Sequence, residues 1–333
     1  MPTVLNDCWL ICERMNDLQI RIKERIQAAQ RVLITSHIRP DGDAIGSSLA
    51  LGLALLDEGK QAQVVLSDGI PSGFKHLPGA EMICTRAEGD FDLIISVDCS
   101  DLERVGKALD GYHAPDIIID HHITTDAFGT LNLVEPEAVA TASVLTRHMA
   151  EWGLTITVPI AANLITGLIT DTLGFRTANT TPEALRQAAD LLELGVNMGS
   201  LYYRSLVRRT YMEAKYWGAG LSSLERKDGI IWATLTVADR IASDYKGKDD
   251  ADLINIISSI DDANVAIIFV EQNAGKTKVS WRSLKPEIDV SQLACQFGGG
   301  GHKAAAGAEV NGTLAEVKER VLKATSECLK DLH

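Results

Sequence analysis

The chain has 333 residues, of which 46% are hydrophobic and 23% charged, and this composition excludes a disordered, collagen-like or rod-like protein. Its length exceeds the size at which one hydrophobic core usually keeps growing, so two domains are expected. The formal net charge of −13 excludes nonspecific binding of duplex nucleic acid through a broad basic face, although bound cations can still bring a phosphate substrate to an acidic site.

Apolar stretches and cysteine spacing indicate the cellular compartment of the protein. Uninterrupted apolar stretches of about 18 residues are absent, and the first forty residues lack the basic and apolar regions of a secretory signal. The six cysteines are scattered without CxxC spacing, which favours reduced thiols over a disulfide framework, and a metal shared by Cys8 and Cys12 would lack its second pair of ligands. We therefore expect a cytoplasmic protein with no membrane partner.

Short β-branched runs alternate with helical patterns in the first part of the chain. Strands are expected over 31–37, 61–67, 91–98 and 115–122, and helices over 43–59, 138–153, 158–171 and 181–195. This alternation is typical of a doubly wound, mostly parallel α/β sheet, in which loops at the carboxyl ends of the strands hold the ligand. The pattern predicts a first domain over residues 1–195.

A connecting helix and a second domain are expected after it. Residues 196–217 are predicted to form a helical linker whose arginines, Arg204, Arg208 and Arg209, lie on a solvated face. Residues 218–333 are predicted to form a smaller α/β domain with a mixed sheet. Its expected strands are 229–237, 264–272 and 277–284, and its expected helices are 253–260 and 314–332.

Ionisable residues follow three of the buried strands in the first domain. The first strand leads into His37, Asp41 and Asp43, another ends at Asp98, and a third runs into Asp120, His121 and His122. For Asp41 and Asp43 two interpretations stay open, which are capping of the following helix and metal binding. Three strand ends that converge on one crevice favour the metal.

The Asp120-His121-His122 run is the most informative of these. Adjacent side chains point to opposite sides, so one imidazole can bind a metal while the other faces a substrate and the carboxylate fixes a tautomer. Asp171 lies near the end of an otherwise apolar helix, where an acid is either a surface residue or paired or liganded. Carboxylates mixed with imidazoles favour a cation such as Mn²⁺ over a zinc site built on thiolates.

The second domain carries a run of four glycines in FGGGGHKAAAG, residues 297–307. Such a run exposes backbone N–H groups, so we expect an anion-binding nest at Gly298, Gly299, Gly300 and Gly301, to which His302 and Lys303 add donors. The alternative is a flexible hairpin turn.

The motifs HIRPDGDAIGS, VDCSD, DHH and LITDTLGF, in this order, resemble the four motifs of the DHH phosphoesterases. VSWRS and FGGGGHKAAAGAEV look like the DHH-associated C-terminal domain, so the resemblance spans nearly the whole chain. At this length the pairing is most similar to the NrnA-type group of nanoRNase/pAp phosphatases. The glycine signature speaks against the related manganese pyrophosphatases, and the length speaks against RecJ-type exonucleases.

The resemblance implies a centre with two metal ions. His37 and Asp41 would hold one ion, and Asp43, His121 and Asp171 the other, with Asp98 bridging both. His122 would face the phosphate, and Asp120 would orient the histidine pair. Substrate contacts would come from Arg282, which can make a bidentate fork with a phosphate, together with Ser283 and the segment formed by Gly298, Gly299, Gly300, Gly301, His302 and Lys303.

The implied activity is Mn²⁺-dependent hydrolysis of very short single-stranded RNA to nucleoside 5′-monophosphates, together with removal of the 3′-phosphate of pAp. Two Mn²⁺ per site are expected, with Mg²⁺ or Co²⁺ as substitutes, and a homodimer is left open. Linear dinucleotides are further candidate substrates. The alternatives are a linear or cyclic dinucleotide phosphodiesterase, a nucleotide-binding regulator without activity, and a polyphosphate hydrolase.

Overall fold

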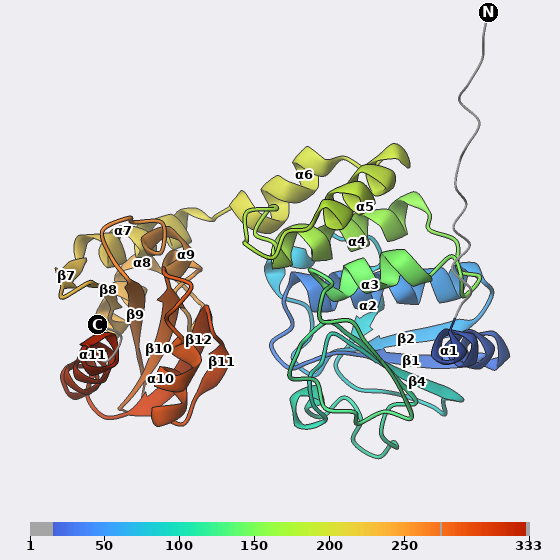
Figure 1. The fold of residues 1–333 in the computed structure, drawn as a ribbon, viewed down its shortest axis with the longest axis horizontal. Coiled ribbons are helices and arrows are strands. Elements are labelled where there is room, and N and C mark those ends of the chain that lie inside the picture. Colours follow the sequence, from blue (N-terminus) through green and yellow to red (C-terminus); the bar gives the residue numbers. More distant parts are fainter. Residues whose placement is uncertain (1–15, 274, 331–333) are drawn as a thin grey trace, which may run out of the picture. The chain divides into compact units, whose positions relative to one another are not determined.

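The computed structural model describes residues 16–273 and 275–330, which form two compact units (Figure 1). The first unit ends at Arg208 and the second begins at Arg209, within the segment that the sequence suggests as a connection. Cys8 and Cys12 lie outside the described residues. Over the described part of the chain, no helix is both long and apolar enough to cross a membrane.

The first unit is built on a parallel six-stranded sheet in the order β3-β2-β1-β4-β5-β6. Its central strands are rich in β-branched residues and are buried apart from Arg31, as expected for strands that are covered on both faces. The strands are β1 (Arg31–Thr35), β2 (Gln61–Val65), β3 (Ile83–Cys84), β4 (Leu93–Val97), β5 (Ile117–Asp120) and β6 (Leu131–Val134). The strand order reverses between β1 and β4, and ligands of such sheets bind outside the carboxyl ends of the strands at this switch point.

Six α-helices pack their apolar side chains into one hydrophobic core with one face of this sheet. The other face is covered by turns and a short 3₁₀ helix, Glu103–Val105, over Leu33 and Ile94. The helices of the first unit are α1 (Asp17–Ala28), α2 (Gly42–Asp57), α3 (Thr141–His148), α4 (Val158–Asp171), α5 (Pro182–Glu193) and α6 (Met198–Tyr202), with further 3₁₀ turns at Ser72–Phe74 and Ala80–Met82. The predicted α/β class with a parallel sheet is confirmed.

Helices α2 and α4 approach each other closely because glycines lie at their crossing. A Cβ atom on Gly46 would lie 2.5 Å from the carbonyl oxygen of Asn163, and one on Gly167 would lie 2.5 Å from Oδ1 of Asp43. Real Cβ atoms do not come this close to such oxygens. The two glycines therefore set the separation of the helices that carry Asp43 and Asp171.

The prediction of one continuous helix between the domains is wrong. Helix α6 runs into a π-helical turn (Tyr203–Val207), and the backbone then becomes extended at Arg208, with φ −60° and ψ 126°. Helix α7 (Tyr211–Ser222) starts afresh at the N-cap Thr210, whose side chain accepts from the backbone N–H of Glu213 while the Glu213 side chain accepts from the N–H of Thr210. This capping box stabilises a helix start and so favours a break in front of it.

The second unit contains a mixed sheet in the order β11-β12-β10-β9-β8-β7, as expected. Only β8 and β9 pair in parallel among its described strands. Two separate cores, one with Trp281 and Val317 and one with Tyr216 and Leu253, lie against this sheet. The elements are β7 (Glu225–Lys227), β8 (Ile230–Leu235), α8 (Val237–Ser243), α9 (Leu253–Ile257), β9 (Val265–Gln272), β10 (Lys276–Ser283), α10 (Val290–Gln296), β11 (Gly300–His302), β12 (Ala305–Asn311) and α11 (Leu314–Lys330).

Candidate metal centre

Asp41 follows β1 and is the N-cap residue of α2. Its Oδ1 accepts the backbone N–H groups of Asp43 and Ala44, at 3.0 and 3.1 Å. Its Oδ2 lies 3.9 Å from Nε2 of His37. The two interpretations that the sequence leaves open are therefore compatible, because one oxygen caps the helix and the other faces the cluster.

Asp43 is buried in the first turn of α2, and its carboxylate meets the start of α3. Its Oδ2 accepts the N–H of Thr141 at 2.6 Å, and its Oδ1 accepts the N–H of Ala142 at 3.0 Å and the hydroxyl of Ser47 at 3.2 Å. Helix α3 has no side-chain cap of its own, so an acid from another helix satisfies its first N–H groups. These hydrogen bonds fix the orientation of the Asp43 carboxylate.

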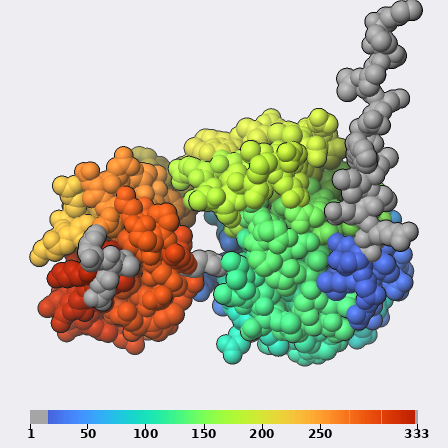
Figure 2. Space-filling view, viewed as in Figure 1, coloured from blue at the N-terminus to red at the C-terminus, as the bar shows by residue number. Residues whose placement is uncertain are grey.

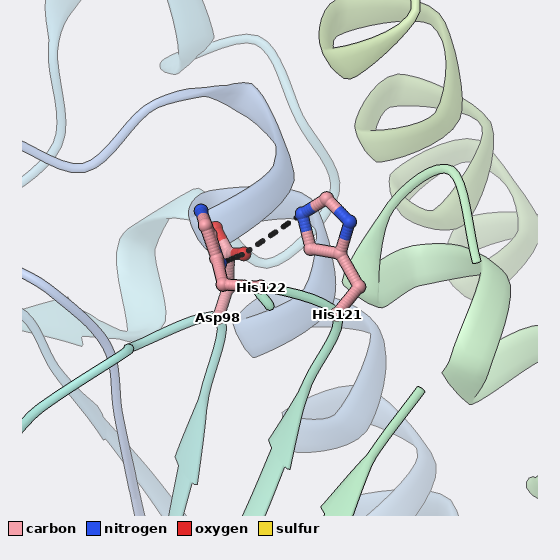
Figure 3. Close-up of side chains that lie close together, drawn as sticks. All are labelled: Asp98, His121 and His122. Carbon is pink, nitrogen blue, oxygen red and sulfur yellow. Dashed lines mark ion pairs between the residues drawn. The ribbon is translucent and has the colours of Figure 1, made fainter. Parts of the chain in front are cut away.

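Asp98 lies at the centre of the cluster, directly after β4. Its Oδ2 is 3.5 Å from Nε2 of His37. Its Oδ1 is 3.8 Å from Nε2 of His121 and 3.7 Å from Nδ1 of His122 (Figure 3). Its backbone has φ 52°, a left-handed conformation that is costly for a residue other than glycine and that recurs at functional sites. The hydroxyl of Thr141 donates to Oδ1 at 3.1 Å.

The backbone fixes the orientation of two imidazoles. Nδ1–H of His37 donates to the carbonyl of Ile38 at 2.9 Å, and Nδ1–H of His121 donates to the carbonyl of Ala138 at 3.2 Å. A carbonyl can only accept, so in the neutral ring the lone pair is on Nε2, which faces the carboxylates in both residues. Two acceptors that face each other call for a cation or a proton between them, which is the usual arrangement of metal-binding histidines.

Asp120 orients His122 rather than both histidines. Its buried Oδ1 accepts from Nδ1–H of His122 at 2.8 Å and from the backbone N–H of His121 at 2.8 Å, and its Oδ2 accepts the hydroxyl of Thr125 at 2.5 Å. The His121 ring is instead held by Ala138. The expected role of Asp120 thus applies to one ring only, because adjacent side chains point in different directions from the loop.

Asp171 ends helix α4, with Oδ2 3.4 Å from Nε2 of His121 and a side chain that is 29% exposed. Burial and the nearby charges of Asp43 and Asp98 raise its pKa well above the usual value. Burial, followed by the charge of Asp98, likewise raises the pKa of Asp43 to about 7. Burial acts on Asp98 in the same direction, but the hydrogen bond to His37 and the charges of the three histidines outweigh it, so its pKa is lowered.

This donor set fits divalent cations. Mutual repulsion of the carboxylates is what a cation would relieve, and oxygen with imidazole donors suits Mn²⁺, Mg²⁺ or Co²⁺ better than a thiolate-seeking ion. Each group below offers three ligand atoms that all lie within 4.8 Å of one another. The groups are His37, Asp41 and Asp98; Asp43, His121 and Asp171; and Asp98, His121 and His122.

Sequence reasoning missed Thr141, Thr125 and Ser47, whose side chains or backbone N–H groups contact the carboxylates of the cluster. Thr141 contacts two of the carboxylates, through its N–H to Asp43 and its hydroxyl to Asp98. A usable signal was present in the sequence VATAS, which starts a helix without a capping side chain and so requires an acceptor from elsewhere. The identity of that acceptor depends on the tertiary fold.

The expected substrate contacts of the second unit lie at the end of β10. The guanidinium of Arg282 is partly buried, and its Nη1 donates to the carbonyl of Trp281 at 3.2 Å. Burial lowers its pKa, and the charges of Asp250 and Asp252 oppose this. Ser283 is engaged locally, since its hydroxyl donates to the carbonyl of Lys285 at 2.6 Å.

The glycine run is not a nest of four exposed N–H groups. The N–H of Gly298 donates to the carbonyl of Cys295 and that of Gly299 to the carbonyl of Ala294, at 3.1 and 2.9 Å, so both close the end of α10. Gly300 and Gly301 pair with β12. Lys303 is exposed in the turn, and the side chain of His302 lies outside the described part of the structure.

The close pairing with β12 explains why glycine is needed here. A Cβ on Gly299 would lie 2.2 Å from the carbonyl oxygen of Gly307, and one on Gly301 would lie 2.5 Å from that of Ala305. Gly301 also has φ 145°, which disfavours other residues. The glycines thus serve the hairpin, which was the alternative interpretation.

Comparison with known proteins matches each unit to a known domain family. The description "DHH family, N-terminal domain" matches residues 31–172, and "DHHA1 domain" matches residues 233–331. The bifunctional oligoribonuclease and PAP phosphatase NrnA of Thermus thermophilus is 35% identical over 300 residues, covering 89% of this chain and 89% of that protein. A probable bifunctional oligoribonuclease and PAP phosphatase NrnA of Streptococcus mutans is 28% identical, covering 86% of this chain and 92% of that protein.

Solved structures share the fold. An exopolyphosphatase-related protein of Bacteroides fragilis superposes with a TM-score of 0.87 at 26% identity, covering 94% of this chain and 97% of that one. RecJ of Thermus thermophilus in complex with Mn²⁺ has a TM-score of 0.51 at 16% identity and covers 93% of this chain and 54% of that one. From these matches, and from the ordered cluster at the strand ends, the chain belongs to the DHH family.

Proposed function

We propose that this chain is a metal-dependent phosphoesterase that hydrolyses very short single-stranded RNA to nucleoside 5′-monophosphates and removes the 3′-phosphate of pAp. The observation that carries the proposal is the cluster at the switch point, where Asp98 belongs to a group with His37 and to a group with His121. The names of the Thermus and Streptococcus relatives support this choice of substrates.

In this proposal the ligands divide into two sets that share one carboxylate. His37 and Asp41 hold one ion, Asp43, His121 and Asp171 hold the other, and Asp98 contacts both. Two bound Mn²⁺ would lower the pKa of a water molecule and stabilise negative charge on the leaving oxygen of an in-line displacement. Mg²⁺ or Co²⁺ are expected to substitute, because the donor set contains no thiolate.

His122 is proposed to contact the phosphate. Burial disfavours its charged form, but the hydrogen bond to Asp120 outweighs this and raises its pKa. Since Nδ1–H is committed to Asp120, a protonated ring presents Nε2–H as its second donor. That donor can neutralise a phosphate oxygen or pass its proton to the leaving 3′-oxygen.

One set of residues can perform both reactions. In pApA the internucleotide phosphorus is attacked and its bond to the 3′-oxygen of the first nucleotide breaks, and in pAp the terminal 3′-phosphate is attacked and the same type of bond breaks. In both, one water is consumed and a 3′-hydroxyl is released. The two substrates differ only in whether a second nucleoside follows the scissile phosphate.

Residues 218–333 are proposed to contribute substrate binding, and residues 1–195 catalysis, with residues 196–217 connecting them. Arg282 has the guanidinium fork that suits a phosphate. The remaining proposed contacts are Ser283, Lys303 and the segment formed by Gly298, Gly299, Gly300, Gly301 and His302.

A comparison of initial rates with Mn²⁺ tests the proposal. The substrates are a 5′-labelled dinucleotide, a 24-mer, pAp, linear and cyclic di-AMP, pyrophosphate and tripolyphosphate. We expect dinucleotide and pAp turnover to dominate, with mutual competitive inhibition and inhibition constants near the KM values. Dominant turnover of cyclic di-AMP, pyrophosphate or tripolyphosphate, or absence of all turnover with metal bound, would refute it in favour of the corresponding alternative.

A further inference from the structure

The π-helical turn after α6 exposes aromatic and basic side chains on the first unit. Tyr203 is 56% exposed, Val207 is 51% exposed, and Arg204 is exposed between them. Figure 2 shows the segment that contains α5 and α6, coloured yellow-green, at the surface of this unit. Single π-helical turns in a helix are rare and occur frequently at functional sites, so this turn calls for an explanation.

Tyr202, which directly precedes the turn, packs on the chain that follows the metal-centre residue Asp171. A Cβ on Gly174 would lie 2.5 Å from the Tyr202 ring, so that ring covers Gly174. Gly174 is three peptide units after Asp171, which limits their Cα–Cα distance to about 11 Å. Leu173, Gly174 and Phe175 all have left-handed backbones, with φ of 48°, 76° and 63°. Such conformations are costly for residues other than glycine and recur at functional sites.

Positive charge gathers at this surface. The π-helical turn contacts the 3₁₀ turn Ser72–Phe74, which leads into the exposed Lys75 and the partly buried His76. Burial lowers the pKa of His76, and the charges of Arg204 and Arg208 lower it further, as they must when cations lie nearby. In a chain of net charge −13, this basic surface next to an acidic cluster is complementary to a polyanion.

Exposed tyrosine beside arginine is the combination that binds single-stranded nucleic acid, since aromatic rings stack on bases and guanidinium groups pair with phosphates. We propose that Tyr203 and Arg204 bind the nucleotides of an oligonucleotide that extend beyond the phosphate held at the metal centre. This inference rests on the proposed function. It predicts that the surface matters for chains in which nucleotides follow the scissile phosphate and not for pAp, which has none there.

The test measures kcat and KM of Tyr203→Ala, Tyr203→Phe and Arg204→Ala with pAp and a pentaribonucleotide. Arg186→Ala is the matched control, since Arg186 is an exposed arginine on α5 of the same unit. We expect Tyr203→Ala and Arg204→Ala to raise the pentanucleotide KM about tenfold, as expected for loss of one stacking or phosphate contact. Tyr203→Phe keeps the stacking ring and should stay near wild type, as should Arg186→Ala, and pAp kinetics should stay within about twofold in every variant.

A binding measurement without divalent metal provides an independent readout. A pentanucleotide that carries 2-aminopurine at its second position is titrated with protein in EDTA, and stacking on Tyr203 should quench its fluorescence. Tyr203→Ala should abolish most of the quenching, and Tyr203→Phe should retain it. Unchanged quenching with Tyr203→Ala, together with an unchanged pentanucleotide KM, would overturn the inference.

Two further outcomes distinguish failure of the proposed function from failure of this inference alone. If the wild type turns over none of the oligonucleotides, the proposed function and this inference fail together. If Tyr203→Ala converts a dimer into a monomer in analytical ultracentrifugation and leaves the pentanucleotide KM unchanged, the surface is a contact between copies of the chain, and the inference alone is overturned.

Discussion

Replacement of Gly46 by alanine tests whether close packing of α2 and α4 positions the metal ligands. The added Cβ would lie 2.5 Å from the carbonyl oxygen of Asn163 and 3.1 Å from the backbone nitrogen of Gly167. Both neighbours are backbone atoms in a buried helix, so relief requires the helices to separate. An ordinary van der Waals contact is about 3.5 Å or more, which sets the required shift at about 1 Å.

Two consequences follow from that shift. Overpacking of this kind costs about 1–3 kcal/mol, which corresponds to a fall in Tm of about 2–12 °C for a unit of this size. The shift also separates Asp171 on α4 from Asp43 on α2, and a misplacement of about 1 Å in an active site can reduce the rate about 100-fold. We therefore expect Gly46→Ala to lower both Tm and kcat.

Differential scanning calorimetry and pAp kinetics measure the two effects, with Gly218→Ala as the control. A Cβ on Gly218 in α7 meets no atom within 4 Å, so alanine there should stabilise its helix by about 0.5–1 kcal/mol and leave kcat unchanged. If Gly46→Ala kept the wild-type Tm and a kcat within about threefold of wild type, the helix crossing would not position the ligands as argued.

Three other changes have expected outcomes. Asp98→Asn should lower activity by several orders of magnitude and reduce Mn²⁺ stoichiometry in titration calorimetry with an unchanged circular dichroism spectrum, and two bound ions with activity within about tenfold would contradict this. Burial opposes charge on His148, but hydrogen bonds to Glu135 and Glu151 raise its pKa above 6.5, so its protonated form stabilises the fold below about pH 6.5 and this contribution is lost as the pH rises through the raised pKa. His148→Gln should therefore lower Tm more at pH 6 than at pH 9, and an equal loss at both would argue against it. Because burial raises the pKa of Asp43 from 3.8 to about 7, the metal-free fold should lose stability as the pH rises through that range, and Mn²⁺ should raise Tm more at pH 8 than at pH 5.5.

Much of the first unit could be predicted because its signals are local. The buried strands have β-branched sequences, and every proposed ligand except Asp171 follows such a strand. A parallel sheet therefore brings Asp98 next to His121 without further information. The carboxylate and imidazole side chains then indicate that the bound ion is a divalent cation. Strand β6, by contrast, was not predicted, since it spans only Leu131–Val134 and is half buried.

The remaining features depend on tertiary contacts. No local pattern indicates that Asp43 satisfies the first N–H groups of α3, because the two segments lie 98 residues apart. The break before Thr210 has a local signal, the capping-box residues Thr210 and Glu213, which the prediction of a helical linker did not use. The glycine run was read for its exposed N–H groups, whereas the tight approach of Gly299 to Gly307 decides its conformation.

Anomalous diffraction from crystals grown with Mn²⁺ tests the two-metal assignment most directly. The account predicts two peaks about 3.5–4 Å apart, both next to the Asp98 carboxylate. One should adjoin His37 and Asp41, and the other should adjoin Asp43, His121 and Asp171. A single peak at full Mn²⁺ occupancy, or peaks that do not share Asp98, would contradict it.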